Sequence, residues 1–134
     1  MIFMLLTKEC DYAVRIVRCL ADMEIKTVKE ICAEENVPLP FAYRIMKKLE
    51  NVKIVMSYRG PAGGYKLMKY PNAITLYNII SAVDGRLLLI ECQRKDVRCA
   101  NNKIGKKCKI HAEFNRIQTI LIKSLGEKKL SELV

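Results

Sequence analysis

The sequence predicts a mainly α-helical protein with a small β-hairpin wing: a winged helix-turn-helix followed by a long C-terminal helix. Three observations predict this fold. Two short amphipathic segments occupy residues 27–49, a hairpin pattern with a glycine-rich turn covers 54–68, and an apolar stripe at helical spacing runs over 110–125. A helix-turn-helix followed directly by a hairpin is the layout of a winged helix.

The helices before the hairpin are predicted from apolar periodicity and capping residues. Apolar side chains recur at helical spacing over 8–21. Thr27 and Glu30 form a capping-box pattern at the start of the second helix, and Pro40 suits the first turn of the third. The inward face of this third helix is expected to hold Ala42, Ile45, Met46 and Leu49. Its outward face is expected to hold Tyr43, Arg44, Lys47 and Lys48.

The hairpin and the last two helices follow from local composition. Residues 54–59 and 65–68 are rich in the β-branched and aromatic residues typical of strands, and the glycines between them permit a tight loop. Thr75 is a suitable N-cap for a helix over 75–84. The apolar stripe over 110–125 is wider than one small chain covers. We therefore expect this last helix to pair with its copy in a second subunit.

Charge and composition favour a cytoplasmic protein that binds an anionic partner. Lys and Arg total 24 against 14 Asp and Glu, a net charge of +10, which attracts nucleic acid, anionic membrane or acidic protein alike. The apolar runs at 1–6 and 87–90 are too short for a signal peptide or a membrane span. Arg59 at the hairpin tip is placed to enter a DNA minor groove, where the potential is negative.

Several segments carry a family resemblance. Residues 8–15 (KECDYAVR), 27–31 (TVKEI), 59–65 (RGPAGGY) and 108–111 (CKIH) occur in the order found in IscR/NsrR/CymR-type winged-helix transcriptional regulators, which the chain resembles over almost its whole length. The resemblance implies a homodimer that binds double-stranded DNA at a dyad-symmetric operator, and our hypothesis is a repressor or dual regulator. It also implies that residues 4–7 (MLLT) are the usual family beginning, so that residues 1–3 are an extension or Met4 is the true start. The implied DNA contacts are Tyr43, Arg44 and Lys47 in the major groove and Arg59 and Gly60 in the minor groove.

The expected division of the chain follows from these elements. Residues 1–85 are expected to form the winged helix-turn-helix DNA-binding domain, and residues 86–134 the cysteine loop and the dimerisation helix.

Three cysteines cluster in a segment with almost no apolar pattern. Cys92, Cys99 and Cys108 follow the spacing Cys-x6-Cys-x8-Cys, which is wider than the five-residue gaps usual in the family. The resemblance implies that they ligate an iron–sulfur cluster, expected as [2Fe-2S]. Seven basic residues and one acid lie between positions 93 and 109, and positive charge favours the thiolate that binds metal.

Three thiolates leave a fourth ligand position open. His111 is the single histidine, shares a helix face with Cys108, and matches the histidine ligand of IscR-like members. Asp11 matches the carboxylate that NsrR-like members take from the partner subunit, with Glu9 and Cys10 as neighbouring alternatives. Asp11 is equally suited to cap the first helix.

Other interpretations of the loop stay open at this point. Zinc in a Cys3His site and a metal-free thiol switch both fit the residue types, although zinc sites usually place cysteines two to four residues apart. Inert surface thiols are a third possibility. An iron–sulfur carrier or a thiol oxidoreductase is disfavoured, because the chain has no Cys-x-x-Cys pair and no nucleotide-binding glycine pattern. We expect a regulator rather than an enzyme.

Overall fold

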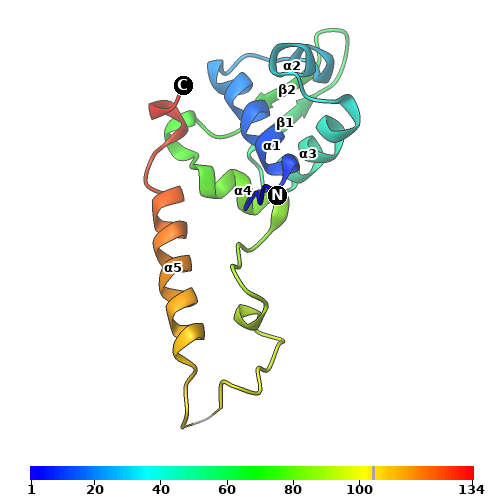
Figure 1. Cartoon of the computed structure of the whole chain (residues 1–134). Helices are drawn as coiled ribbons and strands as arrows, with labels where there is room; N and C mark the ends of the chain where they lie inside the picture. The colour runs from blue at the N-terminus through cyan, green and yellow to red at the C-terminus, as the bar shows by residue number, and fades with distance from the viewer. Residues whose placement is uncertain (104) are drawn as a thin grey trace.

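The computed structural model describes residues 1–103 and 105–134 (Figure 1). The helices are α1 (Lys8–Cys19), α2 (Val28–Glu35), α3 (Leu39–Asn51), α4 (Leu76–Asp84) and α5 (Lys109–Leu125). Strands β1 (Val55–Tyr58) and β2 (Gly64–Leu67) lie between α3 and α4. Short 3₁₀ helices are η1 (Leu20–Asp22), η2 (Pro71–Ala73), η3 (Glu91–Gln93) and η4 (Leu130–Glu132). This order confirms the predicted winged helix-turn-helix with a long C-terminal helix.

The core of the winged-helix unit forms where α1 packs against α2, α3 and α4. The predicted inward face of α3 is confirmed, because all four of its apolar side chains are fully buried. The stripe of α1, which begins with Ala13 and Ile16, is buried in the same core. Burial of these side chains is the main source of stability for so small a unit.

Side-chain caps begin three of the helices. Thr7 accepts from the backbone N–H of Cys10 at the start of α1, and Thr75 caps α4 in the same way. The predicted capping box of α2 is present: the Glu30 N–H donates to Thr27, and the Glu30 carboxylate accepts from the Thr27 N–H at 2.6 Å. Since Thr7 is the cap of α1, the suggestion that Asp11 caps this helix is wrong.

The hairpin is antiparallel, with Val55 opposite Leu67 and Tyr58 opposite Gly64. The backbone of Lys26, just before α2, exchanges hydrogen bonds of 2.9 and 2.7 Å with Tyr65 and so anchors the wing to the helices. Gly64 is required at this junction, because a Cβ there would lie 2.4 Å from the Lys26 carbonyl oxygen.

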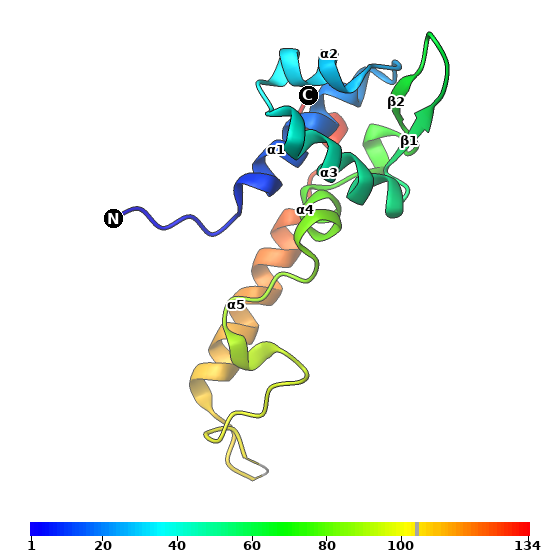
Figure 2. The same cartoon turned by 90° about the vertical axis from the view of Figure 1, so that its right-hand side faces the viewer.

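The segment from residue 86 through α5 extends away from the winged-helix unit as an arm, as both views show (Figures 1 and 2). The chain leaves α4 at Gly85, forms η3, and returns along α5. Beyond α5, Leu130 is buried and its N–H donates to the Ile74 carbonyl at 2.7 Å, which ties the C-terminal end to the winged-helix unit. Within the described ranges, none of the helices has the length and apolar content needed to cross a membrane.

Candidate functional site

The outer surface of α3 carries the predicted DNA-contacting side chains. Tyr43, Arg44 and Lys47 are exposed along it, while the opposite face is buried in the core. The Arg44 guanidinium lies 4.7 Å from the centre of the Phe41 ring, which holds the side chain in a cation–π contact. Lys48 departs from the prediction, because its ammonium turns back to the Glu9 carboxylate at 3.0 Å and to the Val83 carbonyl at 3.1 Å.

The hairpin tip presents a second basic feature. Arg59 and Gly60 are exposed there, and Gly60 has a φ of 100°, which favours glycine. Figure 2 shows the hairpin projecting beyond the helices. Among the residues that the structure describes, Arg44, Lys47 and Arg59 take part in no ion pair, so their charges are available to a phosphate backbone.

The candidate ligands of the cysteine loop line two hollows. Cys92 and Cys99 line an open hollow of about 750 Å³, and Cys108 and His111 line another of about 330 Å³. Asn102 contributes to both hollows, and its Oδ1 accepts from the Cys108 N–H at 3.0 Å. All three cysteines are half-buried free thiols.

Only part of the candidate ligand set is in contact. The Cys92 Sγ lies 3.2 Å from the His111 Nδ1, whereas no group of three or more His, Cys, Asp or Glu side chains within 1–103 and 105–134 is arranged to hold a metal ion. Cys99 and Cys108 therefore have to approach this pair before the full predicted set can bind one centre. The donor types are those of an iron–sulfur or zinc site.

The carboxylate alternatives lie on α1, away from the loop of the same chain. Asp11 accepts two hydrogen bonds from Arg15, at 3.1 and 3.0 Å, in an i,i+4 pair. Glu9 is occupied by Lys48, and the buried Cys10 thiol donates to the Asp84 carboxylate at 3.0 Å. Of these groups, Asp11 is the more exposed.

The remaining thiols have the environment of small core residues. Burial and the neighbouring Asp84 raise the pKa of Cys10 to about 11, and burial and the neighbouring Glu34 raise the pKa of Cys19 to about 12. Burial also raises the pKa of Cys32. These three thiols are thus poor metal ligands at neutral pH, as expected from their positions in helical segments.

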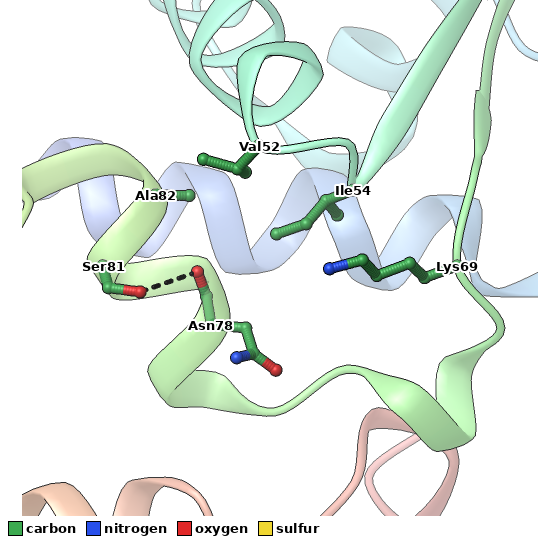
Figure 3. Close-up of a pocket in the computed structure, with 6 residues that line it drawn as sticks. All are labelled: Val52, Ile54, Lys69, Asn78, Ser81 and Ala82. Atoms are coloured by element: carbon green, nitrogen blue, oxygen red, sulfur yellow. Dashed lines mark hydrogen bonds between the residues drawn. The ribbon is translucent and has the colours of Figure 1, made fainter.

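A further hollow of about 150 Å³ lies between the end of α3, the hairpin and α4 (Figure 3). Ile54 and Ala82 contribute apolar side chains to its lining, the Lys69 side chain extends toward Ile54, and the Ser81 hydroxyl donates to the backbone carbonyl of Asn78 at 3.2 Å. It contains no cysteine or histidine among its described lining residues. It is therefore separate from the candidate ligands.

The chain matches a known protein family over almost its whole length. Residues 6–134 match the model of the Rrf2 family, described as iron-dependent transcriptional regulator. The chain belongs to the Rrf2 family. Like other Rrf2 proteins it is a DNA-binding transcriptional regulator and not an enzyme, which confirms the predicted resemblance and class of function.

Rrf2 relatives cover most of the chain. It is 26% identical to an rrf2-like HTH-type regulator of Rhodobacter capsulatus over 90% of this chain and 88% of that protein. It is 32% identical to the HTH-type transcriptional regulator IscR of Escherichia coli over 78% of this chain, and the match spans 62% of the length of IscR.

Solved Rrf2-type structures share the fold. The global cysteine regulator CymR of B. subtilis matches 99% of this chain and 96% of its own, with a TM-score of 0.76 and 24% identity. IscR of T. potens matches 96% of this chain and 84% of its own, with a TM-score of 0.73 and 18% identity.

Two amide side chains that the sequence did not predict as part of the site lie beside the candidate ligands. Gln93 donates to Asn115 at 3.0 Å, and Asn115 in turn contacts the Nε2 of His111 at 3.0 Å. Gln and Asn in a polar loop and on a helix carry no pattern of their own. Only their positions in the sequence could have indicated a role beside the candidate ligands. Gln93 follows Cys92 directly, and Asn115 lies one turn beyond His111 on the same helix face.

Proposed function

We propose that this Rrf2 protein is a repressor-type regulator whose operator affinity is controlled by an iron–sulfur cluster, [2Fe-2S], bound by Cys92, Cys99 and Cys108. The observation that carries the proposal is the placement of three free thiols and the single histidine around two hollows that share Asn102 in one loop. The iron-dependent description of the family supports it. In this proposal residues 1–85 bind DNA, and residues 86–134 hold the cluster and form the dimer.

The chemistry of the donor set fits such a group. Thiolate sulfur is a soft ligand suited to iron–sulfur centres. A histidine imidazole can take the place of a cysteine as a ligand of such a centre. The seven basic residues between positions 93 and 109 offset the negative charge of a thiolate-ligated centre. When bound, the cluster would supply a centre that responds to redox state and to loss of iron.

The loop joins the DNA-binding unit to the proposed dimerisation helix α5. Gly85, where the loop begins, follows α4, and Cys108 is the N-cap residue of α5. Gathering Cys92, Cys99 and Cys108 shortens the path between α4 and α5 and so orients α5 against the winged-helix unit. The recognition helices of a dimer must match half-sites about 34 Å apart, so a small rotation of each unit changes operator affinity.

Homodimerisation, as proposed here, uses α5 and the neighbouring groove. Ile110 and Ile120 are 66% and 51% exposed on α5, and Ile117 is exposed beside them. An apolar groove of about 280 Å³, lined by residues that include Val14 and Ile80, runs between α1, α4 and α5. A second copy would cover both surfaces.

The fourth ligand is proposed to be His111, with Asp11 of the partner subunit as the alternative. His111 already contacts Cys92. Asp11 would first have to leave its two hydrogen bonds with Arg15. Removal of Arg15 would therefore favour a site that uses Asp11 and leave a site that uses His111 unchanged.

A second candidate function is a metal-free thiol switch. The contact between Cys92 and His111 favours it, because a ring nitrogen within hydrogen-bond reach of a sulfur can donate to the thiolate, the form that reacts with oxidants. The fold is also shared with CymR of Staphylococcus aureus in an oxidised form. Zinc in a Cys3His site uses the same four side chains.

Anaerobic purification followed by reconstitution with iron and sulfide tests these functions. We expect a coloured protein with a visible absorption band, and equal iron and sulfide content per subunit. Cys99→Ser is expected to abolish the band, whereas Cys32→Ser, a matched change outside the loop, is expected to leave it intact. A shift assay with promoter DNA then compares loaded and metal-free protein. Colourless protein whose DNA binding responds to thiol oxidation would support the switch and reject the cluster.

A further inference from the structure

We propose that Gln93 and Asn115 form an amide relay that determines which ring nitrogen of His111 carries the proton and directs that proton at Cys92. The relay deepens the proposed function and rests on it, because it concerns how a candidate metal ligand is held before the metal arrives. Its evidence is a continuous chain of hydrogen bonds from backbone N–H groups to a sulfur atom. Neither amide ligates in the proposal; both are positioning residues.

The first link fixes the orientation of Gln93. This side chain is only 8% exposed, and its Oε1 accepts from the backbone N–H groups of Leu89 at 2.8 Å and Ile90 at 3.1 Å. A backbone N–H only donates, so the atom that faces these two groups has to be the carbonyl oxygen. The Nε2 of Gln93 therefore points the other way, where it donates to the Oδ1 of Asn115 at 3.0 Å.

The second link passes this orientation to the imidazole. Because the Oδ1 of Asn115 accepts from Gln93, its Nδ2 faces the Nε2 of His111 at 3.0 Å. An amide N–H only donates, so Nε2 has to accept with its lone pair. In a neutral imidazole the proton is then on Nδ1, the atom that lies 3.2 Å from the Cys92 Sγ.

This arrangement leaves His111 with no free lone pair. Coordination through Nε2 requires Asn115 to withdraw. Coordination through Nδ1 requires the proton to move to Nε2 by exchange with water, and Asn115 to rotate so that its carbonyl accepts that proton. Rotation of Asn115 would in turn break its bond with Gln93. The relay thus opposes metal binding by His111 until the loop rearranges, and it directs the Nδ1 proton at the Cys92 sulfur meanwhile.

The tautomer of His111 tests the relay directly, since a single histidine gives unambiguous ¹⁵N signals. In metal-free protein at mildly alkaline pH, where an ordinary imidazole is neutral, we expect the proton on Nδ1. In Gln93→Glu, the new carboxylate accepts from Leu89 and Ile90 but also offers an acceptor to Asn115. Asn115 should rotate, and the proton should move to Nε2. The two nitrogen resonances then exchange character although the substitution lies two links from the ring.

Two further variants keep the test decisive. Asn115→Asp places an acceptor directly at Nε2 and should produce the same exchange if Gln93→Glu fails to fold. Asn101→Asp makes the same change of charge on an exposed loop residue and should leave the tautomer unaltered. A wild-type proton on Nε2, or an unchanged tautomer in both relay variants, would overturn the relay.

Cluster uptake separates the relay from the proposed function. With iron and sulfide as the probe, Asn115→Ala should load severalfold faster than wild type, because no hydrogen bond to His111 has to be broken. An equal or slower rate contradicts the gating role. If the wild-type chain takes up no cluster, the proposed function fails while the ¹⁵N result still decides the relay.

Discussion

Gln118 is a buried polar side chain on the last helix. It lies on α5 one turn beyond Asn115, is 7% exposed, and its buried Oε1 has no hydrogen-bond partner among the described residues. An unsatisfied buried acceptor costs about 1–3 kcal/mol, and an apolar side chain of similar volume avoids that cost. We expect Gln118→Leu to raise the free energy of unfolding by about 1 kcal/mol, measured by urea denaturation at fixed protein concentration. Lower stability of Gln118→Leu would show that the amide has a partner.

The thiols divide into two classes by environment. The pKa values of Cys10 and Cys19, at about 11 and 12, keep these groups protonated at any pH well below those values. Since only the thiolate is alkylated and both of these groups are buried, brief iodoacetamide treatment of metal-free protein at mildly alkaline pH should modify Cys10 and Cys19 last, after the half-buried loop cysteines. Peptide mass spectrometry checks the order. Labelling of Cys10 or Cys19 at the same rate as the loop cysteines would contradict it, unless the protein has unfolded under the conditions used, which circular dichroism monitors.

At the scale of elements, Lys48 joins three helices. From α3 its ammonium contacts Glu9 of α1 and the Val83 carbonyl at the C-terminal end of α4, where a helix favours a cation. Because Lys48 is partly exposed, its loss in Lys48→Met should cost only about 1 kcal/mol of stability. DNA affinity should fall as well, because α3 loses the polar contacts that fix it against Glu9 of α1 and the C-terminal end of α4.

A double-mutant cycle isolates this contact. Glu9→Gln removes the partner carboxylate and leaves every basic side chain in place, and the coupling energy between Glu9→Gln and Lys48→Met reports the pair itself. Additive effects on both unfolding and DNA binding would mean that the Glu9–Lys48 pair does not help to hold the helices together. Lys29→Met on the exposed side of α2 is the charge-matched control.

Sequence patterns between near neighbours predicted the helices and strands. Contacts between residues far apart in the sequence could not be predicted from such patterns. Thr27 and Glu30 are neighbours in sequence, so their capping box was visible, and the glycines at 60–64 marked the wing. Lys48 sits at a position that helical periodicity assigns to the surface. Its inward turn depends on Glu9, 39 residues away. The burial of Gln118 likewise depends on how the arm folds back along α5.

For the whole molecule, the sequence indicates which residues are candidate ligands, but it does not indicate how these side chains are arranged. Residue types and family pattern predict Cys92, Cys99, Cys108 and His111 as ligands, and one pair of these candidates is in contact. The wide gaps in the loop leave many paths between its ends, so spacing alone cannot specify which ligands meet. The orientation of the histidine comes from two amides that no metal-site pattern includes.

The charge of the whole molecule leads to a test of how it binds DNA. With a net charge of +10, part of its affinity comes from counterion release, and a phosphate-contacting lysine contributes about one unit to the salt slope. We expect Lys47→Ala to reduce the slope by about one and to weaken all sequences alike. Arg44→Ala should instead cost about 1–3 kcal/mol on the operator and relax sequence preference, because an exposed arginine on α3 can contact base edges.

The wing completes the same test. Arg59→Ala should weaken binding most where the operator has a narrow, A·T-rich minor groove, because the potential that attracts a guanidinium is strongest there. Lys128→Ala, an exposed lysine beyond α5, is the control and should change neither slope nor preference. Fluorescence anisotropy across a salt series measures all four variants. Equal losses for Lys47→Ala, Arg59→Ala and Lys128→Ala would mean that net charge alone drives binding, and that α3 and the wing do not form the DNA-binding surface.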